Sequence, residues 1–491
     1  MVKRYLNQIT LKEAVEIIRS TPPVIGSRHL SLIDSVGHIL AESLYAEYSV
    51  PEVPTSAMDG FSVVSSETAA AGDQTPVTLT NVERLNTGNP VGNTFDAVVK
   101  VEDVWFEDEK TTEIVIRKSI NPGTNIRPPG EDIKKGQLIL PAGVKISPFN
   151  IGAIAAYGIT SVRVKRVCAG IIPTGTELIS PGTRPAPGQV VESNTIMAEA
   201  YLRQFGIDVI RYPPVVDNRV LIHGAVEKAA DECDIIIISA GSSAGTKDYT
   251  SSVISEMGKV LFHGISMKPA KPAMFGIINK KPVFGLPGYP LAAQTVLRVL
   301  IAELLDSWGW TGPEKQTVPV VLGSPVSSEG GMDEFGLYAA ARMGDHYTAI
   351  PLSRGASVQM TGVRSNSIVH IPIGVEGYEA GEIVDAFLQV PKEELDHTIL
   401  IAGVYNESID RLTEKCMKEG IRIRAAPASG ISALILLMNG ACHLASVSNG
   451  EDISICGTDK NTGKLGNLIL VSKKEIADSK VKRVFELATQ I

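Results

Sequence analysis

The sequence predicts a multidomain protein in which α/β and β segments alternate, and three observations lead to this fold class. The chain has 491 residues, which exceeds the size at which a single hydrophobic core stops growing. In residues 168–312, apolar strands alternate with helices on the scale of a doubly wound α/β domain. In residues 46–140 and 313–392, short alternating runs are separated by Gly, Pro and Asn turns, which is typical of small β domains.

The chain opens with a helix whose start is marked by a capping box. Thr10 is followed three residues later by Glu13 and by a stripe of apolar residues. The short β-like runs of residues 46–140 begin after this helix and indicate an inserted domain. We therefore group residues 1–45 with residues 141–167 as a linker or dimerisation domain that the insertion interrupts.

Three further domains are expected after residue 167. Residues 168–312 form the doubly wound domain, with a nearly wholly apolar strand at 234–239 that indicates burial on both faces of a parallel sheet. Residues 313–392 form a β-barrel-like domain. Residues 398–491 begin a new strand–helix pattern and predict a small α/β module that ends in a helix at 473–489.

Bulk properties exclude several classes of partner. The formal net charge of −8 argues against nucleic acid, because binding to a phosphate backbone needs a basic face. The five cysteines have no CxxC or zinc-ligand spacing, so we expect buried free thiols in a reducing compartment. We find no run of eighteen apolar residues and no signal-peptide core, so we expect no membrane partner and a cytoplasmic location.

A loop of small residues follows the apolar strand at 234–239. Small side chains there let backbone N–H groups approach an anion, at the carboxyl edge where open α/β sheets bind ligands. The loop is neither a Walker A loop nor GxGxxG, and an ordinary tight turn explains it equally well. Its candidate ligand-binding residues are Gly241, Ser242, Ser243 and Gly245.

Two lysines and a proline-rich turn form a second candidate site. Lys268 and Lys271 are separated by a stiff Pro-Ala segment, which suits the neutralisation of an oxyanion or phosphate. By themselves they are more typical of two solvated lysines in a proline-rich turn. Further on, Pro287-Gly288 leads into a helix, with Pro290 in its first turn.

Carboxylates in tight turns form a third set. Asp59 lies in Ser56-Ala-Met-Asp-Gly, and Asp132 is expected near Arg127. Such residues often only cap backbone groups. Together with the lysines and the anion loop, they fit a Mg²⁺-assisted reaction on a phosphate. The residues themselves indicate no more than that.

Seven motifs, in order over residues 10 to 390, resemble the molybdopterin molybdotransferase family, which includes bacterial MoeA and the E domain of gephyrin. The motifs are Pro54-Thr-Ser-Ala-Met-Asp-Gly-Phe, Asn86-Thr-Gly-Asn-Pro-Val, Asn125-Ile-Arg-Pro-Pro-Gly-Glu-Asp-Ile, Pro173-Thr-Gly-Thr-Glu-Leu, Gly241-Ser-Ser-Ala-Gly-Thr-Lys-Asp-Tyr-Thr, Lys268-Pro-Ala-Lys-Pro and Gly285-Leu-Pro-Gly-Tyr-Pro. The resemblance implies an elongated four-domain subunit in a homodimer. It also implies a reaction in which adenylated molybdopterin and molybdate give molybdenum cofactor and AMP with Mg²⁺.

The resemblance also assigns roles to individual residues. The catalytic set is Asp59, Asp132, Asp217, Asp248, Lys268 and Lys271, of which Asp59 and Asp248 are the expected Mg²⁺ ligands. The substrate-binding set is Thr87, Arg127, Glu177, Gly241, Ser242, Ser243, Gly245, Pro272, Pro287, Gly288 and Pro290.

The chain departs from the family pattern at three positions. Tyr289 stands where the family usually has Asn, Ala292 where a Ser usually follows, and Met332 where many members have Arg. The last two remove polar groups near the oxyanion, and the candidates to replace them are Arg342, Arg354 and Arg364.

Two alternatives therefore stay open: a non-catalytic molybdopterin-binding scaffold or sensor, and the same reaction with tungstate. An adenylyltransferase of the related single-domain type fits poorly, since that type lacks the β domains. The C-terminal module resembles part of a periplasmic-binding-protein-like domain. We expect a vestigial or packing role for it, and the sensing of an oxyanion or pterin stays open as the alternative.

Overall fold

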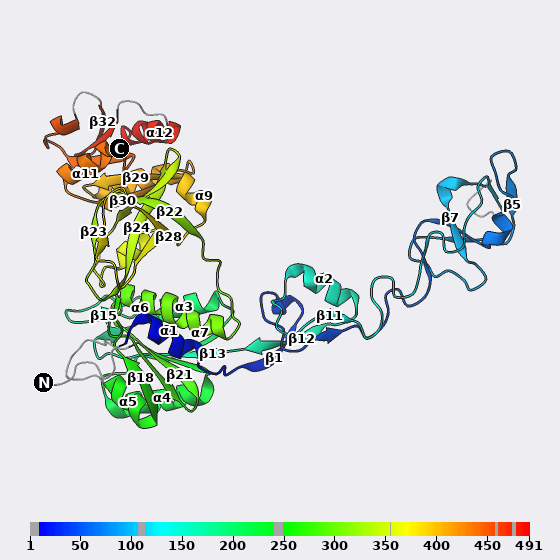
Figure 1. Cartoon of the computed structure of the whole chain (residues 1–491), viewed down its shortest axis with the longest axis horizontal. Coiled ribbons are helices and arrows are strands. Elements are labelled where there is room, and N and C mark those ends of the chain that lie inside the picture. Colours follow the sequence, from blue (N-terminus) through cyan, green and yellow to red (C-terminus); the bar gives the residue numbers. More distant parts are fainter. Residues whose placement is uncertain (1–8, 107–112, 240–248, 354, 457–459, 474–477) are drawn as a thin grey trace. The chain divides into compact units, whose positions relative to one another are not determined.

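The computed structural model describes residues 9–106, 113–239, 249–353, 355–456, 460–473 and 478–491. The chain divides into two compact units, one made of Met1–Ile25 with Val167–Ile491 and the other of Gly26–Arg166. Figure 1 draws both with the labels used below. No helix within these residues is long and apolar enough to cross a membrane.

The larger unit contains the doubly wound α/β domain. Its six-stranded sheet has the order β16-β13-β17-β21-β20-β18, in which β20 runs antiparallel to the other five strands. The strands are β13 (Cys168–Pro173), β16 (Asp208–Arg211), β17 (Ile235–Ser239), β18 (Gly258–His263), β20 (Met274–Ile278) and β21 (Lys281–Leu286). Every residue of β17 is buried, as its sequence predicted.

Helices cover both faces of this sheet. On one face, α4 (Arg219–Glu232) and α5 (Tyr249–Met257) pack on the core, and Figure 1 shows them together below the sheet. The other face carries α1 (Leu11–Arg19), α3 (Asn194–Arg203), α6 (Pro290–Val296), the π-helical segment η4 (Leu297–Ile301) and α7 (Ala302–Ser307). The predicted doubly wound architecture is confirmed.

The first helix belongs to this unit. The capping box of α1 forms as predicted, with Thr10 accepting from the Glu13 N–H. Arg19 pairs with Glu303 of α7 at 2.6 Å, and the Trp308 ring N–H donates to the Thr21 carbonyl at 3.1 Å. Residues up to 25 therefore group with the α/β domain, whereas the sequence grouped residues 1–45 with a linker. The other boundaries of that scheme stay predictions.

A closed β-barrel follows the α/β domain. Its strands pair in the ring β24-β25-β22-β28-β26, which closes because β26 also pairs with β24. The strands are β22 (Thr317–Leu322), β24 (Asp333–Met343), β25 (His346–Pro351), β26 (Ser367–Ile371) and β28 (Ile383–Leu388). The two-residue strand β19 (Met267–Lys268) of the α/β domain joins β24 in parallel.

The smaller unit is built from short β elements. β1 (Gly26–Ser31) pairs antiparallel with β12 (Ser161–Arg166), beside α2 (Pro148–Ala156). Two three-stranded sheets follow the orders β6-β4-β7 and β5-β9-β8 and share one apolar core. Their strands are β4 (Gly60–Val63), β5 (Val77–Leu79), β6 (Glu83–Leu85), β7 (Ala97–Lys100), β8 (Val104–Trp105) and β9 (Ile114–Ile116).

The C-terminal module is a five-stranded mixed sheet with helices on both faces. Its strand order is β30-β29-β31-β33-β32. Its elements are β29 (Thr398–Gly403), α10 (Glu407–Met417), β30 (Arg422–Pro427), α11 (Gly430–Met438), β31 (Leu444–Ser448), β32 (Lys460–Leu465), β33 (Leu468–Lys473) and α12 (Ser479–Ala488).

The predicted final helix at 473–489 was wrong in its extent. The sequence missed the hairpin of β32 and β33, and α12 begins only at Ser479. Gly466 turns this hairpin with a positive φ of 57°, a backbone conformation that glycine adopts without strain. The Gly466-Asn467 pair between two alternating runs was the signal that the sequence offered.

This module shares a hydrophobic core with the barrel. Ala339, Ala341, Ile350 and Leu352 of the barrel pack in one cluster with side chains of β29 and α11. The alanines let the two sheets approach closely. The burial in this cluster supports the packing role expected of the module.

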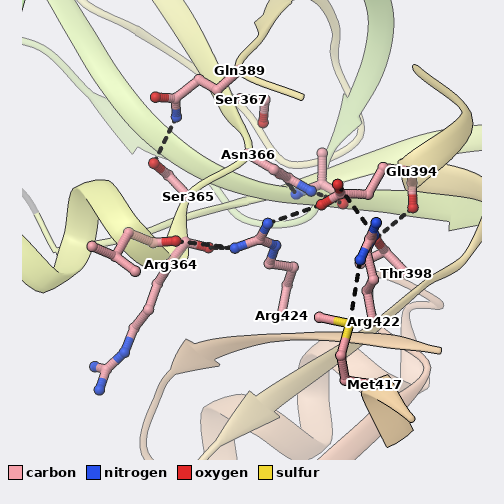
Figure 2. A network of polar contacts seen from close by, with 12 residues as sticks. Arg364, Ser365, Asn366, Ser367, Gln389, Glu394, Thr398, Met417, Arg422 and Arg424 are labelled. Carbon is pink, nitrogen blue, oxygen red and sulfur yellow. Dashed lines mark hydrogen bonds and ion pairs between the residues drawn. The ribbon is translucent and has the colours of Figure 1, made fainter. Parts of the chain in front are cut away.

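A polar network adds to this contact, as Figure 2 shows. Glu394 of α9 (Lys392–Asp396) accepts hydrogen bonds from Arg424 at 3.0 Å and pairs with Arg422 at 3.1 Å. Arg424 also donates to the Val363 carbonyl at 3.0 Å, in α8 (Gln359–Arg364). The Glu394 side chain is only 14% exposed, so its charge depends on both arginines for compensation.

Replacing Glu394 should therefore destabilise the protein. In Glu394→Gln, two partly buried guanidinium groups lose their carboxylate, and we expect the free energy of unfolding to fall by about 1–3 kcal/mol, less than for a fully buried pair. The matched control is Glu407→Gln, whose pair with Arg411 is exposed and should contribute about 0.5 kcal/mol or less. Urea denaturation of both variants measures the difference. Equal losses would show that the network contributes nothing beyond a surface ion pair.

Candidate functional site

The polar loops at the carboxyl edge of the α/β sheet form the first part of the candidate site. β13 and β16 are neighbours and parallel, so the loops after them lie at the same edge. Asp217 accepts from the backbone N–H of Thr176 at 3.4 Å, and its own N–H donates to the Thr176 hydroxyl at 3.2 Å. The loop that carries Glu177 is thus tied to the loop that carries Asp217. The sequence did not single out Thr176.

The anion loop after β17 lies outside the described residues. This applies to Gly241, Ser242, Ser243 and Gly245, and equally to the expected Mg²⁺ ligand Asp248. Their assignments remain predictions.

The turn after β21 is held by a residue that the sequence analysis did not single out. Pro290 is the first residue of α6, as predicted. The Asn194 side-chain amide, from the first turn of α3, donates to the Gly288 carbonyl at 2.8 Å and so holds the Pro287-Gly288 turn. Asn194 is almost fully buried. The sequence analysis missed it, although an Asn side chain at the start of a helix often hydrogen-bonds to nearby backbone groups.

The lysine strip lies where the α/β domain meets the barrel. Lys268 pairs in register with Glu334 of β24, and its ammonium lies 3.9 Å from the Glu334 carboxylate. Glu334 is buried and also accepts from the Ser328 hydroxyl at 2.9 Å. Lys271 is held by its carbonyl, which accepts from the Ile265 N–H at 2.8 Å. Lys271 and Pro272 are both half-buried.

A pocket of about 40 Å³ opens beside Lys268. By this measure one water needs about 10–15 Å³, so the pocket holds about three waters. This is the scale of a small tetrahedral oxyanion and far below that of a pterin. Its polar lining is Lys268, Gln294, Thr295, Arg298, Glu334 and Ser353.

The three departures from the family pattern lie in different surroundings. Tyr289 is 61% exposed, and its side chain makes no cap to α6. Ala292 and Met332 are both buried, and neither side chain carries a polar group.

Two of the three arginines expected to compensate, Arg342 and Arg364, are not among the residues that line the pocket. Arg342 donates to the Gly344 carbonyl and pairs with Asp396 at 3.3 Å. Arg364 stacks over the Tyr405 ring at 4.0 Å. Arg354 lies outside the described residues. Among the described residues, the arginine that lines the pocket is Arg298, which the sequence analysis missed.

The smaller unit contains Asp59 and Thr87, which the sequence analysis named separately as candidate site residues and which the structure joins by hydrogen bonds. Asp59 Oδ1 accepts from the Thr87 backbone N–H at 2.6 Å and from the Thr87 hydroxyl at 2.9 Å. These two bonds favour the ionised form and lower the pKa of Asp59. Two residues that are 28 positions apart in the sequence are thus brought together.

Arg127 and Asp132, which were expected to lie near each other, each contact a different residue. Arg127 pairs with Glu131, its i+4 neighbour, rather than with Asp132. Asp132 accepts from the Tyr157 hydroxyl at 3.1 Å. Burial and this hydrogen bond together raise the pKa of Tyr157.

Of the two expected Mg²⁺ ligands, the smaller unit supplies Asp59. Within the described residues, no three His, Cys, Asp or Glu side chains gather into a metal cluster. Mg²⁺ is usually held by one or two carboxylates with water and substrate phosphates, so such a cluster is not required. Asp59 is exposed and uses Oδ1 for both bonds to Thr87, while Oδ2 accepts no hydrogen bond from a described residue. A hard cation bound through Oδ2 therefore fits its chemistry.

A doubly wound sheet with polar loops at its carboxyl edge, together with a cationic pocket, defines an α/β protein that binds anionic small ligands. Comparison with known proteins specifies the class. Residues 9–158 match the MoeA N-terminal region (domains I and II), and residues 170–307 match a probable molybdopterin binding domain.

Relatives extend the match over most of the chain. Molybdopterin molybdenumtransferase 2 of Mycobacterium tuberculosis is 31% identical, over 74% of this chain and 95% of that protein. The molybdopterin molybdenumtransferase of Haemophilus influenzae is 30% identical, over 62% and 80%. The molybdopterin biosynthesis MoeA protein of Pyrococcus horikoshii has a solved structure with a TM-score of 0.66 and 29% identity, over 78% and 99%. The chain belongs to the molybdopterin molybdenumtransferase (MoeA) family.

The Asp59–Thr87 contact can be tested by titration. Asp59 should titrate below its ordinary pKa of 3.8, so its carboxylate stabilises the fold above that pH and loses this contribution as pH falls through the lowered pKa. In Thr87→Ala the hydroxyl bond is lost but the backbone bond remains, and the pKa should rise part of the way back. Carbon-13 NMR of the carboxylate measures both values. An unchanged pKa in the variant would contradict the contact.

Proposed function

We propose that this chain inserts molybdenum from molybdate into adenylated molybdopterin with Mg²⁺ and releases AMP. Family membership makes it a transferase of molybdenum cofactor biosynthesis that acts on molybdopterin. The observation that carries the finer proposal is the small cationic pocket at Lys268, because its size and charge suit molybdate. The pterin itself is too large for that pocket and needs the open edge of the α/β sheet.

Several loops at this edge are proposed to bind the pterin together. The turn of Pro287 and Gly288 supplies backbone groups, and Asn194 keeps it in place. The loops of Glu177 and Asp217 are tied together and offer hydrogen-bond acceptors. Gly241, Ser242, Ser243 and Gly245 are proposed to bind the phosphates through their N–H groups.

Lys268, Lys271 and Pro272 are proposed to bind the oxyanion and to compensate the charge that develops on the phosphate. Asp59 and Asp248 are the proposed Mg²⁺ ligands, with Asp132, Thr87 and Arg127 positioning the nucleotide. When bound, Mg²⁺ would neutralise the phosphate oxygens around which bonds change. We further propose a homodimer in the cytoplasm as the working form.

A non-catalytic scaffold or sensor is the competing function. It is favoured by the burial of Ala292 and Met332, which leaves their positions without polar groups. Tungstate in place of molybdate is the second alternative, since the two oxyanions have nearly the same size and charge.

Single-turnover release of AMP tests the proposal. Adenylated molybdopterin is mixed with the full chain, Mg²⁺ and either molybdate or tungstate. We expect AMP release that requires the oxyanion, and the faster anion identifies the metal. Tight binding of the adenylated pterin without release under either anion would establish the scaffold instead.

Lys271 tests the role of the lysine strip. In Lys271→Ala we expect turnover to fall by about 10²–10³-fold, as for the loss of one electrostatic stabiliser. The backbone contact to Ile265 is kept, so the melting temperature should stay within about two degrees of the wild type. The control is Lys259→Ala, an exposed lysine of β18. A Lys271→Ala variant that melts early or aggregates would instead assign this lysine to the fold.

A further inference from the structure

The cationic pocket contains a residue that the proposed function has not yet used. Arg298 lies in the π-helical segment η4, which follows α6 directly. π-Helical turns place a side chain where a regular helix would not, and they are frequent at functional sites. Here the side chain reaches the pocket that Lys268 lines from β19.

The charges around the pocket do not cancel. Lys268 lies 3.9 Å from Glu334, so these two groups compensate each other. Arg298 is a second cation of the lining, and the described lining residues include no second carboxylate to match it. The pocket therefore carries an excess positive charge that an oxyanion can neutralise.

Arg298 has no anionic partner within the part of the chain that the structure describes. It forms no ion pair there, and the titratable side chain that acts on its pKa is that of Tyr201. Burial raises the pKa of Tyr201 to about 12, so the phenol is neutral near pH 7 and leaves the guanidinium uncompensated. Burial lowers the pKa of Arg298, yet arginine remains protonated in proteins.

A partly buried, unpaired guanidinium is costly in the free protein. The same group gains most from an anion that enters the pocket, because Coulombic attraction is strong where water is partly excluded. Gln294, Thr295 and Ser353 add polar groups to the same lining and complete a site for an anion with several oxygens.

We propose that Arg298 is the oxyanion-binding arginine of this protein and takes the part that Met332 leaves vacant. The ligand is a tetrahedral dianion, with molybdate or tungstate as the functional examples. This inference rests on the proposed function for the identity of the oxyanion. The affinity of the pocket for the free anion, which Arg298 is proposed to raise, can be measured whether or not the protein turns over.

The experiment compares the full chain with Arg298→Met, Arg298→Gln and Arg298→Lys. Calorimetric titration with molybdate alone measures the Kd, and single-turnover assays measure the molybdate concentration that gives half-maximal AMP release. We expect both values to rise by about 10–100-fold in the Met and Gln variants, as for the loss of one charge-assisted contact. The Lys variant should stay within about tenfold of the wild type, because it keeps the charge.

Two controls separate charge from structure. Arg203→Met removes an exposed arginine of α3 that pairs with Glu199, and it should leave the Kd for molybdate unchanged. The Kd for adenylated molybdopterin should be the same in all variants. A change in that Kd equal to the change for molybdate would assign Arg298 a structural role and overturn the inference.

The outcomes distinguish this inference from the proposed function. Molybdate binding that is equally tight in the wild type and the neutral variants overturns the role of Arg298, whatever the turnover. A wild type that binds molybdate through Arg298 but releases no AMP keeps the inference and rejects the transferase proposal. The Gln variant decides the matter if the Met variant fails to fold.

Discussion

The candidate site depends on one short contact, the parallel pairing of β19 with β24. Asp333 donates its N–H to the Ser266 carbonyl at 2.9 Å, and Lys268 comes into register with Glu334. This pairing attaches the α/β domain to the barrel and brings a lysine from one beside a buried carboxylate from the other. The pocket exists because α6 and η4 then face β24. Both cations of the pocket come from the α/β domain, and its carboxylate, Glu334, comes from the barrel.

The barrel also packs against the C-terminal module. β24 contributes the small residues Ala339 and Ala341, and β25 contributes Ile350, to the core that the barrel shares with the C-terminal module. Glu394 adds a compensated charge network to that contact. β24 thus runs from the pocket at Glu334 to the module, and the packing of the module supports the strand that forms the pocket wall. This links residues 398–491 to the site without giving them a ligand of their own.

Much of the fold could be predicted from the sequence, because periodicity and turn residues are local signals. The capping box at Thr10 and the apolar strand β17 were predicted correctly. The hairpin before α12 was missed because its first strand, Lys460–Leu465, is mostly polar and carries no apolar periodicity. In the site, Asp59 and Thr87 were predicted through their motifs. Arg298 was not, because one cation within an apolar helix gives no sequence signal of the strand that faces it.

The most direct test is a crystal structure of the full chain soaked with tungstate at a concentration that supports binding. Tungsten scatters anomalously, so its position is found without assumptions about the ligand. The account predicts an anomalous peak within contact distance of the Lys268 ammonium and the Arg298 guanidinium, and its absence in crystals of Arg298→Met. A peak elsewhere in the chain, with the Lys268 pocket empty, would contradict it.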